Sequence, residues 1–297
     1  MKPRIGITLG DPAGIGPEVV RAALASPSLS RDFEYSVIHD TQAFAPGMPT
    51  EASARHAFAA LEEGTRMALN GEIAALVTGP VSKKAMHDVG FDFPGQTEFF
   101  AQRSNTENFA MCLTGGKITV ALVTAHIPLR LVAETLSAPE IVRVGLLLSE
   151  FLTRRGISRP RIAVAGLNPH AGESGDLGRE EIELIWPTIQ ALQEQYSDRA
   201  VFTGPHSPDT LFHQVAAGHY DGVLCMYHDQ GLIPLKLHAF DEGVNVTLGL
   251  PFIRTSPDHG TAFEIAGQNT ARPDSMIAAI TLAAQLAAKR LRKVVNN

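Results

Sequence analysis

Short apolar runs that alternate with helical segments are the feature that most constrains the fold of this chain. Three of the clearest runs cover residues 118–124, 161–167 and 221–227. Runs of five to seven apolar residues, bounded by Gly and Pro and separated by helical stretches, are typical of buried strands in a parallel sheet. Because strands and helices alternate from end to end, the sequence predicts an α/β fold with mainly parallel strands.

Each of these three runs is followed by a histidine, at His126, His170 and His228. Ligands of parallel sheets bind just beyond the carboxyl ends of the strands. Neutral imidazole is a common ligand of zinc and other first-row metals. The chain has 11 histidines, and one at a single strand end would be structural more often than not, but three at equivalent positions predict a shared metal site.

Composition narrows the class of protein. A chain of 297 residues that is 44% hydrophobic can bury two cores, so we expect two domains. A net charge of −6 argues against nucleic acid and against an anionic membrane surface as partners. Cys112 and Cys225 lie in or beside apolar runs and are expected to be buried reduced thiols. Without a secretory or membrane-spanning segment, the expected location is the cytoplasm.

Several further elements can be placed from periodicity and capping signals. We expect Trp186, the only tryptophan, to be a packing residue and the segment after the strand near 246–250 to be a loop through Gly260. Helices are expected at 52–70, closed by Gly71, and at 138–155, 178–196 and 275–291.

Three polar residues interrupt the apolar stretches between 231 and 256. They are Lys236, Asn245 and Arg254. A lone Lys or Arg among Leu, Phe and Ile reaches to the surface more often than it binds an anion. Together, and next to the turn that contains His228, they predict a clamp for phosphate or carboxylate, with Arg254 suited to bidentate contact and Lys236 to a point charge.

The chain contains several long motifs rich in Gly, Pro and polar residues. They are GDPAGIGPE at 10–18, TGPVSK at 78–83, NPHAGE at 168–173, MYHDQG at 226–231, GLPFIRTS at 249–256 and DHGTA at 258–262. These motifs resemble those of the 4-hydroxythreonine-4-phosphate dehydrogenase family of vitamin B6 biosynthesis, and the resemblance covers nearly the whole chain.

The resemblance implies a homodimer of two-domain α/β subunits that is distantly similar to isocitrate and isopropylmalate dehydrogenases. The active site is then expected in the interdomain cleft. We expect residues 1–125 and 250–297 to form the first domain, and residues 126–249 the second domain with the dimer interface.

The resemblance also implies roles for individual residues. His126, His170 and His228 match the metal ligands, and one of the three is expected to come from the partner subunit. The metal would be Zn, Mg or Co, and the cofactor NAD or NADP. The positions that match substrate-binding residues are Thr97, Lys236, Asn245 and Arg254, and those that match the adenosine-side loop of isopropylmalate dehydrogenases include His259, Gly260 and Thr261.

Two departures from the family pattern concern the substrate. Gln96-Thr97-Glu98 stands where members acting on 4-phosphohydroxythreonine usually have His-Thr-Glu, so an amide that cannot carry charge replaces an imidazole at a substrate-binding position. The segment 41–53 is shortened relative to the longer members. Relatives with this general pattern oxidise phosphorylated threonate or erythronate, or a cyclic dihydrodiol dicarboxylate, so a changed substrate is an open alternative.

The expected chemistry is metal-assisted oxidation of a small anionic, phosphorylated hydroxy acid, followed by decarboxylation. A metal ion on three imidazoles would lower the pKa of a substrate hydroxyl, and hydride would pass to the nicotinamide. Candidate catalytic residues are Lys236 and Asp229, the latter either transferring a proton or orienting a metal-bound histidine. Two rival assignments are a metal-dependent hydrolase or aldolase and a binding module without catalysis.

Overall fold

The computed structural model describes residues 2–40 and 44–295, so residues 41–43 of the shortened segment lie outside the described part. The chain folds into two compact units, each of which has its own core. Unit 1 combines the chain up to Glu107 with the chain from Asp241 on, and unit 2 is Asn108–Phe240. These units divide after 107 and 240, and the domain division after 125 and 249 stays a prediction of the sequence.

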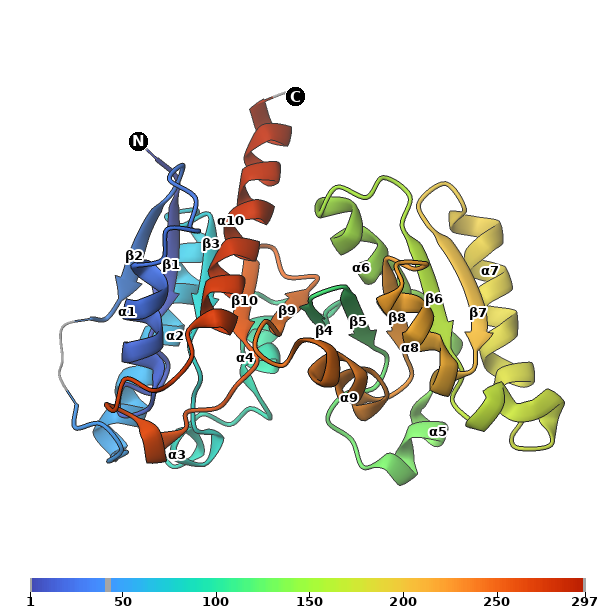
Figure 1. Ribbon diagram of the computed structural model, residues 1–297, viewed down its shortest axis with the longest axis horizontal. Coiled ribbons are helices and arrows are strands. Elements are labelled where there is room, and N and C mark those ends of the chain that lie inside the picture. The colour runs from blue at the N-terminus through green and yellow to red at the C-terminus, as the bar shows by residue number, and fades with distance from the viewer. Residues whose placement is uncertain (1, 41–43, 296–297) are drawn as a thin grey trace. The chain divides into compact units, whose positions relative to one another are not determined.

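Unit 1 contains a five-stranded sheet in the order β2-β1-β3-β10-β9, in which only β9 runs antiparallel to its neighbour (Figure 1). Helices α2 and α10 pack against its strands. The strands are β1 Arg4–Thr8, β2 Glu34–Ile38, β3 Ala75–Thr78, β9 Val244–Leu248 and β10 Ile253–Pro257, and the helices are α1 Gly16–Leu24, α2 Glu51–Leu69, α3 Lys83–His87, α4 Gln96–Arg103 and α10 Asp274–Val295, with a 3-10 turn at Phe263–Ile265.

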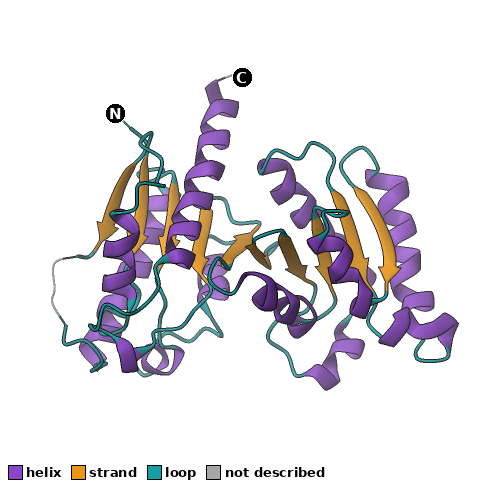
Figure 2. Cartoon of the chain, in the orientation of Figure 1, coloured by secondary structure: helices purple, strands orange, loops and turns teal. Residues whose placement is uncertain are grey.

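Unit 2 contains a second five-stranded arrangement in the order β4-β5-β8-β6-β7, parallel from β5 onward (Figure 2). Its strands are β4 Ala110–Gly115, β5 Ile118–Leu122, β6 Arg161–Ala165, β7 Val201–His206 and β8 Gly222–Cys225. Its helical segments are η1 Leu129–Leu131, α5 Val132–Thr135, α6 Ala138–Arg154, η2 Pro169–Gly175, η3 Glu181–Ile185, α7 Trp186–Tyr196, α8 Pro208–Ala216 and α9 His228–Ala239.

Local signals in the sequence explain where several elements begin and end. Helix α2 starts with a capping box, because the Thr50 hydroxyl accepts from the Ser53 amide at 3.1 Å and the Ser53 hydroxyl accepts from the Thr50 amide at 3.0 Å. It ends before Gly71, which has a φ of +74° as expected of a residue at that position. Gly10, with a φ of +75°, allows the turn after β1 to approach the Pro80 carbonyl, since a Cβ there would lie 2.1 Å from that oxygen.

The strand-end arrangement predicted from the three apolar runs is present in unit 2. Strand β8 pairs in parallel with both β5 and β6, so the three strands are direct neighbours and their carboxyl ends share one edge. These strands contribute to one buried core with α8 and α9, in which Val120, Val223 and Ala163 are fully buried. The ends of these three strands, each of which precedes one of the three histidines, therefore lie at the same edge of the sheet.

Some expectations are wrong. Trp186 is 51% exposed and does not fill the core. Strand β10 occupies residues that the sequence analysis assigns to a loop, because Arg254 interrupts an otherwise buried strand and hides its pattern. Strands β4 and β7 and helix α8 have no counterpart among the elements expected from the sequence. Cys112 and Cys225 are buried free thiols, as expected.

No helix in the described ranges combines the length and the apolar character that crossing a membrane requires.

Candidate active site

Two of the three strand-end histidines lie close together in unit 2. The imidazole centroids of His126, which follows β5, and His228, which opens α9, are 5.7 Å apart. The Nδ1 of His228 lies 2.7 Å from the Asp229 Oδ1. When Nδ1 donates to this carboxylate, the Nε2 lone pair of His228 is free to bind a metal ion, an arrangement that is common around metal-binding histidines.

The third strand-end histidine, His170, pairs with a different carboxylate, that of Asp209. It belongs to the turn η2 after β6, its side chain is 61% exposed, and its Nδ1 is 4.0 Å from the Asp209 Oδ2. Within residues 2–40 and 44–295, no group of three or more His, Cys, Asp or Glu side chains is arranged to hold a metal ion. One subunit therefore brings together two of the three predicted ligands, and this two-imidazole donor set suits a first-row metal better than Mg²⁺.

Arg254 is the centre of a buried polar cluster in unit 1. Its side chain comes from β10 and is 2% exposed. The guanidinium donates to the Thr78 hydroxyl at 2.8 Å and the Thr247 hydroxyl at 3.2 Å. It also lies over the Phe100 ring, 5.2 Å from the centroid. Burial lowers the pKa of Arg254 to about 9, although the nearby Glu98 carboxylate opposes the shift.

Gln96 is bound to this arginine. Its Oε1 accepts from Arg254 Nη2 at 2.9 Å, and its Nε2 donates to the Gly79 carbonyl at 3.2 Å. Both ends of the amide are therefore used within the protein. The structure also brings Asn245 to the cluster, with its Oδ1 3.5 Å from Arg254 Nη1, whereas the Thr97 hydroxyl lies 3.5 Å from that of Thr247.

Lys236 belongs to unit 2, on α9. It lies eight residues after His228, which is about 12 Å along a helix axis. Its Nζ is 5.8 Å from the centroid of the Phe240 ring. Within the clamp predicted from the sequence, Asn245 and Arg254 are thus in contact in unit 1, and Lys236 is on the helix that carries His228.

The predicted cofactor loop, His259 to Thr261, is tied to the Gly-rich turn of unit 1. The Ile15 amide donates to the Thr261 carbonyl at 2.9 Å. The His259 Nε2 is buried and has no hydrogen-bond partner among the described residues. Gly260 is open around its Cα, since an added Cβ would meet nothing within 4 Å.

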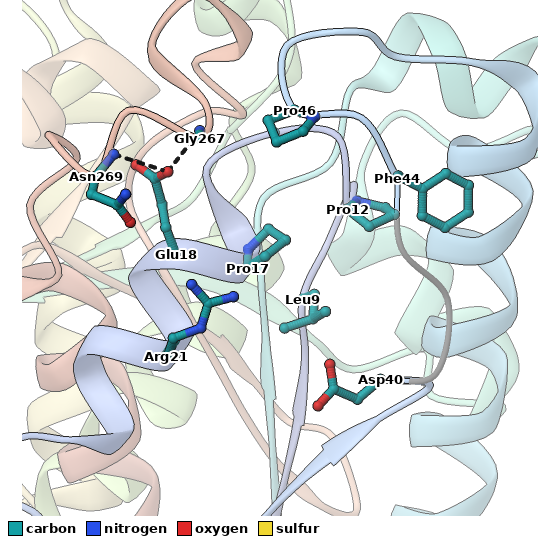
Figure 3. A pocket seen from close by; sticks show the side chains of 11 residues that line it. Leu9, Pro12, Pro17, Glu18, Arg21, Asp40, Phe44, Pro46, Gly267 and Asn269 are labelled. Carbon is teal, nitrogen blue, oxygen red and sulfur yellow. Dashed lines mark hydrogen bonds between the residues drawn. The ribbon is translucent and has the colours of Figure 1, made fainter.

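A cavity of about 520 Å³ lies beside the same turn (Figure 3). Leu9, Pro12, Phe44 and Pro46 line it with apolar surface. Glu18 accepts at its Oε2 from the Gly267 amide at 2.7 Å and from the Asn269 amide at 3.4 Å (Figure 3). These two bonds fix the chain around 267–269 to the first turn of α1, so that the cavity has a rigid wall on this side.

Sequence reasoning misses several residues that support these clusters. Thr247 follows Asn245 by two positions on β9, and the period of a strand could have placed both on the face of Arg254. Thr78 ends β3 within a recognised motif, but its contact with Arg254 spans 176 residues of sequence. Asp209, near His170, and Glu181, beneath the His170 turn, carry no local signal.

Comparisons with known proteins identify the family of this chain. Residues 18–283 match the family described as pyridoxal phosphate biosynthetic protein PdxA. A 4-hydroxythreonine-4-phosphate dehydrogenase of Maricaulis maris is 41% identical, over 95% of this chain and 97% of its own length. A D-threonate 4-phosphate dehydrogenase of Pectobacterium atrosepticum is 40% identical, over 95% of this chain and 99% of its own length.

The similarity extends to solved structures. A crystal structure of 4-hydroxythreonine-4-phosphate dehydrogenase from Klebsiella pneumoniae superposes with a TM-score of 0.80 at 40% sequence identity. The match covers 96% of this chain and 99% of that one.

Proposed function

Because this chain belongs to the PdxA family, we propose that it is a dehydrogenase that oxidises a CH–OH group of a small phosphorylated hydroxy acid. The observation that carries the proposal is the pairing of His126 and His228 at the ends of two neighbouring parallel strands, with a carboxylate on the second imidazole. The relatives named for 4-hydroxythreonine 4-phosphate and for D-threonate 4-phosphate are both dehydrogenases, which argues against a hydrolase, an aldolase or a binding module.

The metal ion is held, in this proposal, by His126 and His228 of one subunit and by His170 of the partner subunit. This division is supported by the closeness of His126 and His228 and by the lack, among the described residues, of a group of three side chains arranged to hold a metal ion. Three imidazoles favour Zn²⁺ or Co²⁺ over Mg²⁺. When bound, the metal ion lowers the pKa of the substrate hydroxyl and the nicotinamide cofactor takes up the hydride.

The residues around the metal ligands then have separate tasks. Asp229 orients His228 and keeps its proton on Nδ1, because its Oδ1 is already engaged there. Lys236, eight residues after His228 on α9, binds an anionic group of the substrate or transfers a proton in this proposal. Oxidation next to a carboxylate-bearing carbon gives a 3-oxo acid, which loses carbon dioxide.

Arg254 supplies the second charge that an anionic substrate requires. It is a buried cation whose hydrogen bonds to Thr78, Thr247 and Gln96 go to neutral oxygens. An anion at this cluster would gain a charge-assisted hydrogen bond in a site with little water. We assign phosphate or carboxylate binding to Arg254, with Asn245, Gln96 and Thr97 completing the cluster.

The preferred substrate follows from Gln96. The Gln96 amide occupies one N–H group of Arg254, so this group is not available to an anionic group of the substrate. The amide cannot supply a positive charge of its own. The two candidate substrates share the 4-phosphate and the carboxylate and differ at carbon 2, which carries an ammonium group in 4-phosphohydroxythreonine and a hydroxyl in threonate 4-phosphate. We propose that the Gln96 amide, whose Oε1 is engaged by Arg254, favours the hydroxyl, so that threonate 4-phosphate is oxidised more efficiently.

The cofactor is assigned to unit 1. The unpartnered His259 Nε2 and the open Gly260 lie next to the turn that borders the 520 Å³ cavity, a volume within the usual range for a small-molecule site. We propose that His259, Gly260 and Thr261 bind the adenosine end of the dinucleotide.

The subunits form a dimer in this proposal through unit 2. Ile233, Leu237 and Phe240 are 65%, 89% and 71% exposed. Their spacing of four and three residues places them on one side of α9, the helix that begins with His228. An apolar stripe next to a metal ligand is suited to contact with a second copy that contributes the missing histidine.

The test of the proposed function is a rate measurement at 340 nm with a panel of phosphorylated four-carbon acids. The reaction contains Zn²⁺, Co²⁺ or Mg²⁺ and either NAD or NADP, and His228→Ala protein serves as the control. We expect metal-dependent reduction of one of the cofactors that the control protein does not support. Turnover of a substrate without cofactor reduction would assign the site to a hydrolase or an aldolase instead.

A further inference from the structure

The backbone that carries His170 has an unusual conformation. Six consecutive residues have positive φ angles: 52° at His170, 52° at Ala171, 80° at Gly172, 44° at Glu173, 59° at Ser174 and 105° at Gly175. Residues with a side chain rarely adopt this region, and a run of them is found only where the surroundings impose it. Something other than local propensity must therefore hold this turn.

The carboxylate of Glu181 lies under the start of the turn. It is 2% exposed. Its Oε1 accepts from the amides of Leu167 and Asn168, at 2.6 and 2.7 Å, and its Oε2 accepts from the Asn168 Nδ2 at 2.9 Å. One buried carboxylate thus takes three N–H donors from the two residues that precede Pro169 and His170.

The turn also closes around the same carboxylate further along. A Cβ on Gly172 would lie 2.7 Å from the Glu181 Oε2, and one on Gly166 would lie 3.2 Å from its Oε1. The chain from 166 to 172, which includes His170, therefore surrounds the carboxylate. The imidazole itself is 61% exposed and its Nδ1 comes no nearer than 4.0 Å to the Asp209 carboxylate, so the backbone sets most of its direction.

We infer that Glu181 is the positioning residue for His170: its carboxylate holds the left-handed turn and so aims the imidazole at the metal ion. This inference rests on the proposed metal site and deepens it. Glu181 touches neither substrate nor metal. Its role differs from that of Asp229, which orients His228 through the imidazole, because Glu181 acts on the backbone.

The first test is metal affinity in Glu181→Gln. Glutamine keeps the shape of the side chain, but an amide NH2 group replaces one of the two carboxylate oxygens. That NH2 group then meets either the Asn168 Nδ2 or the backbone amides, which are donors themselves, and the hydrogen bonds on that side are lost. We expect the affinity for Co²⁺ or Zn²⁺, measured by competition with a chromophoric chelator, to fall about 10- to 100-fold, the usual effect of losing a partner of a metal ligand. Glu183→Gln is the matched control, since Glu183 lies in the same segment, is exposed and forms an ion pair with Arg179.

The second test separates positioning from general folding by mixing variant chains and allowing subunits to exchange, at a metal concentration too low to load Glu181→Gln alone. Glu181→Gln mixed with His126→Ala should regain metal binding and activity, because one site of the hybrid dimer then has intact His126 and His228 from one chain and an intact His170 turn from the other. Glu181→Gln mixed with His170→Ala should regain neither, since both changes affect the same contribution. His126→Ala with His170→Ala is the positive control for a shared site.

The outcomes are distinguishable. Unchanged metal affinity in folded Glu181→Gln, or recovery in its mixture with His170→Ala, overturns the inference. If the positive control pair shows no recovery, the proposal of a site shared between subunits is wrong. The metal affinity of Glu181→Gln then still tests whether Glu181 positions His170, at a site formed within one chain. Should Glu181→Gln not fold, Asn168→Ser removes one donor to the same carboxylate and should lower metal affinity by a smaller factor.

Discussion

Gln96 and Arg254 are coupled at the level of single residues. The amide accepts from the guanidinium and donates to the Gly79 carbonyl, so it stabilises a particular orientation of Arg254. It also occupies an N–H group that would otherwise be available to a phosphate. The residue at position 96 therefore affects the substrate through the arginine as well as by direct contact.

A Gln96→His substitution tests this coupling. Both substrates carry the same phosphate and carboxylate, so the change is expected to act at carbon 2. The neutral ring nitrogen of a histidine can accept from the ammonium group that 4-phosphohydroxythreonine has there, whereas the Gln96 Oε1 is engaged by Arg254. We expect the ratio of kcat/KM for 4-phosphohydroxythreonine to that for threonate 4-phosphate to rise about tenfold, or 1.4 kcal/mol. Gln102→His, at an exposed position on the same helix, is the control. An unchanged ratio would show that position 96 does not determine the substrate.

Arg254 also predicts a pH dependence. Burial lowers its pKa to about 9, so the free enzyme loses the cation as the pH rises through that value. Since kcat/KM reports groups of the free enzyme, it should fall above pH 9 for anionic substrates. Lys236→Met should keep this fall, because Arg254 remains. A flat kcat/KM up to pH 10.5 in the unmodified protein would contradict the assignment.

The fall in activity should not come from unfolding at this residue. The pKa of Arg254 in the folded state lies below its ordinary value of 12.5, so between about 9 and 12.5 the unfolded chain binds more protons at this group. Its contribution to stability therefore increases with pH in that window. Thermal unfolding measured at pH 8 and pH 10 separates this contribution from the change in kcat/KM.

Helix α9 has two functions at the level of elements. Its first residue is a predicted metal ligand, and its exposed side carries the apolar stripe of Ile233, Leu237 and Phe240. Leu232 and Leu235 on the same helix are buried in the core of unit 2. The helix is thus anchored to its own sheet on one side and presents the other for contact.

A charge in the stripe should dissociate the dimer. We expect Leu237→Glu to shift the mass measured by light scattering toward the 31.8 kDa of one chain and to lower metal affinity at the same time. The fold should remain, because the side chain is 89% exposed. Met48→Glu, at a 67% exposed position in unit 1, is the matched control. A dimer that persists in Leu237→Glu would place the interface elsewhere.

For the whole molecule, the proposed division of the three histidines between two subunits predicts a pattern of complementation. Mixtures of His170→Ala with either His126→Ala or His228→Ala should regain up to about one quarter of the activity, since random exchange makes half of the dimers hybrid and restores one of their two sites. His126→Ala with His228→Ala should regain none, because both ligands come from the same chain. Recovery in that last mixture alone would mean that the chain division is wrong.

Much of this protein can be predicted from its sequence, because the decisive signals are local. The apolar runs and their spacing predict α/β units with mainly parallel strands, and each histidine follows its own strand. Parallel neighbours place their carboxyl ends at one edge, so the position of the three residues follows once β5, β8 and β6 are adjacent. The long motifs likewise indicate the family without any structure.

Other features depend on contacts between distant parts of the chain, and only the tertiary structure decided them. The tie between Arg254 and Thr78 spans 176 residues, and β10 is not recognisable as a buried strand until its arginine has these partners. The left-handed turn at His170 has no propensity that predicts it, because the Glu181 carboxylate that holds it comes from a later helix. Sequence alone determined which residues follow each strand, whereas the burial of charged groups and the direction of the His170 backbone depend on partners that folding brings together.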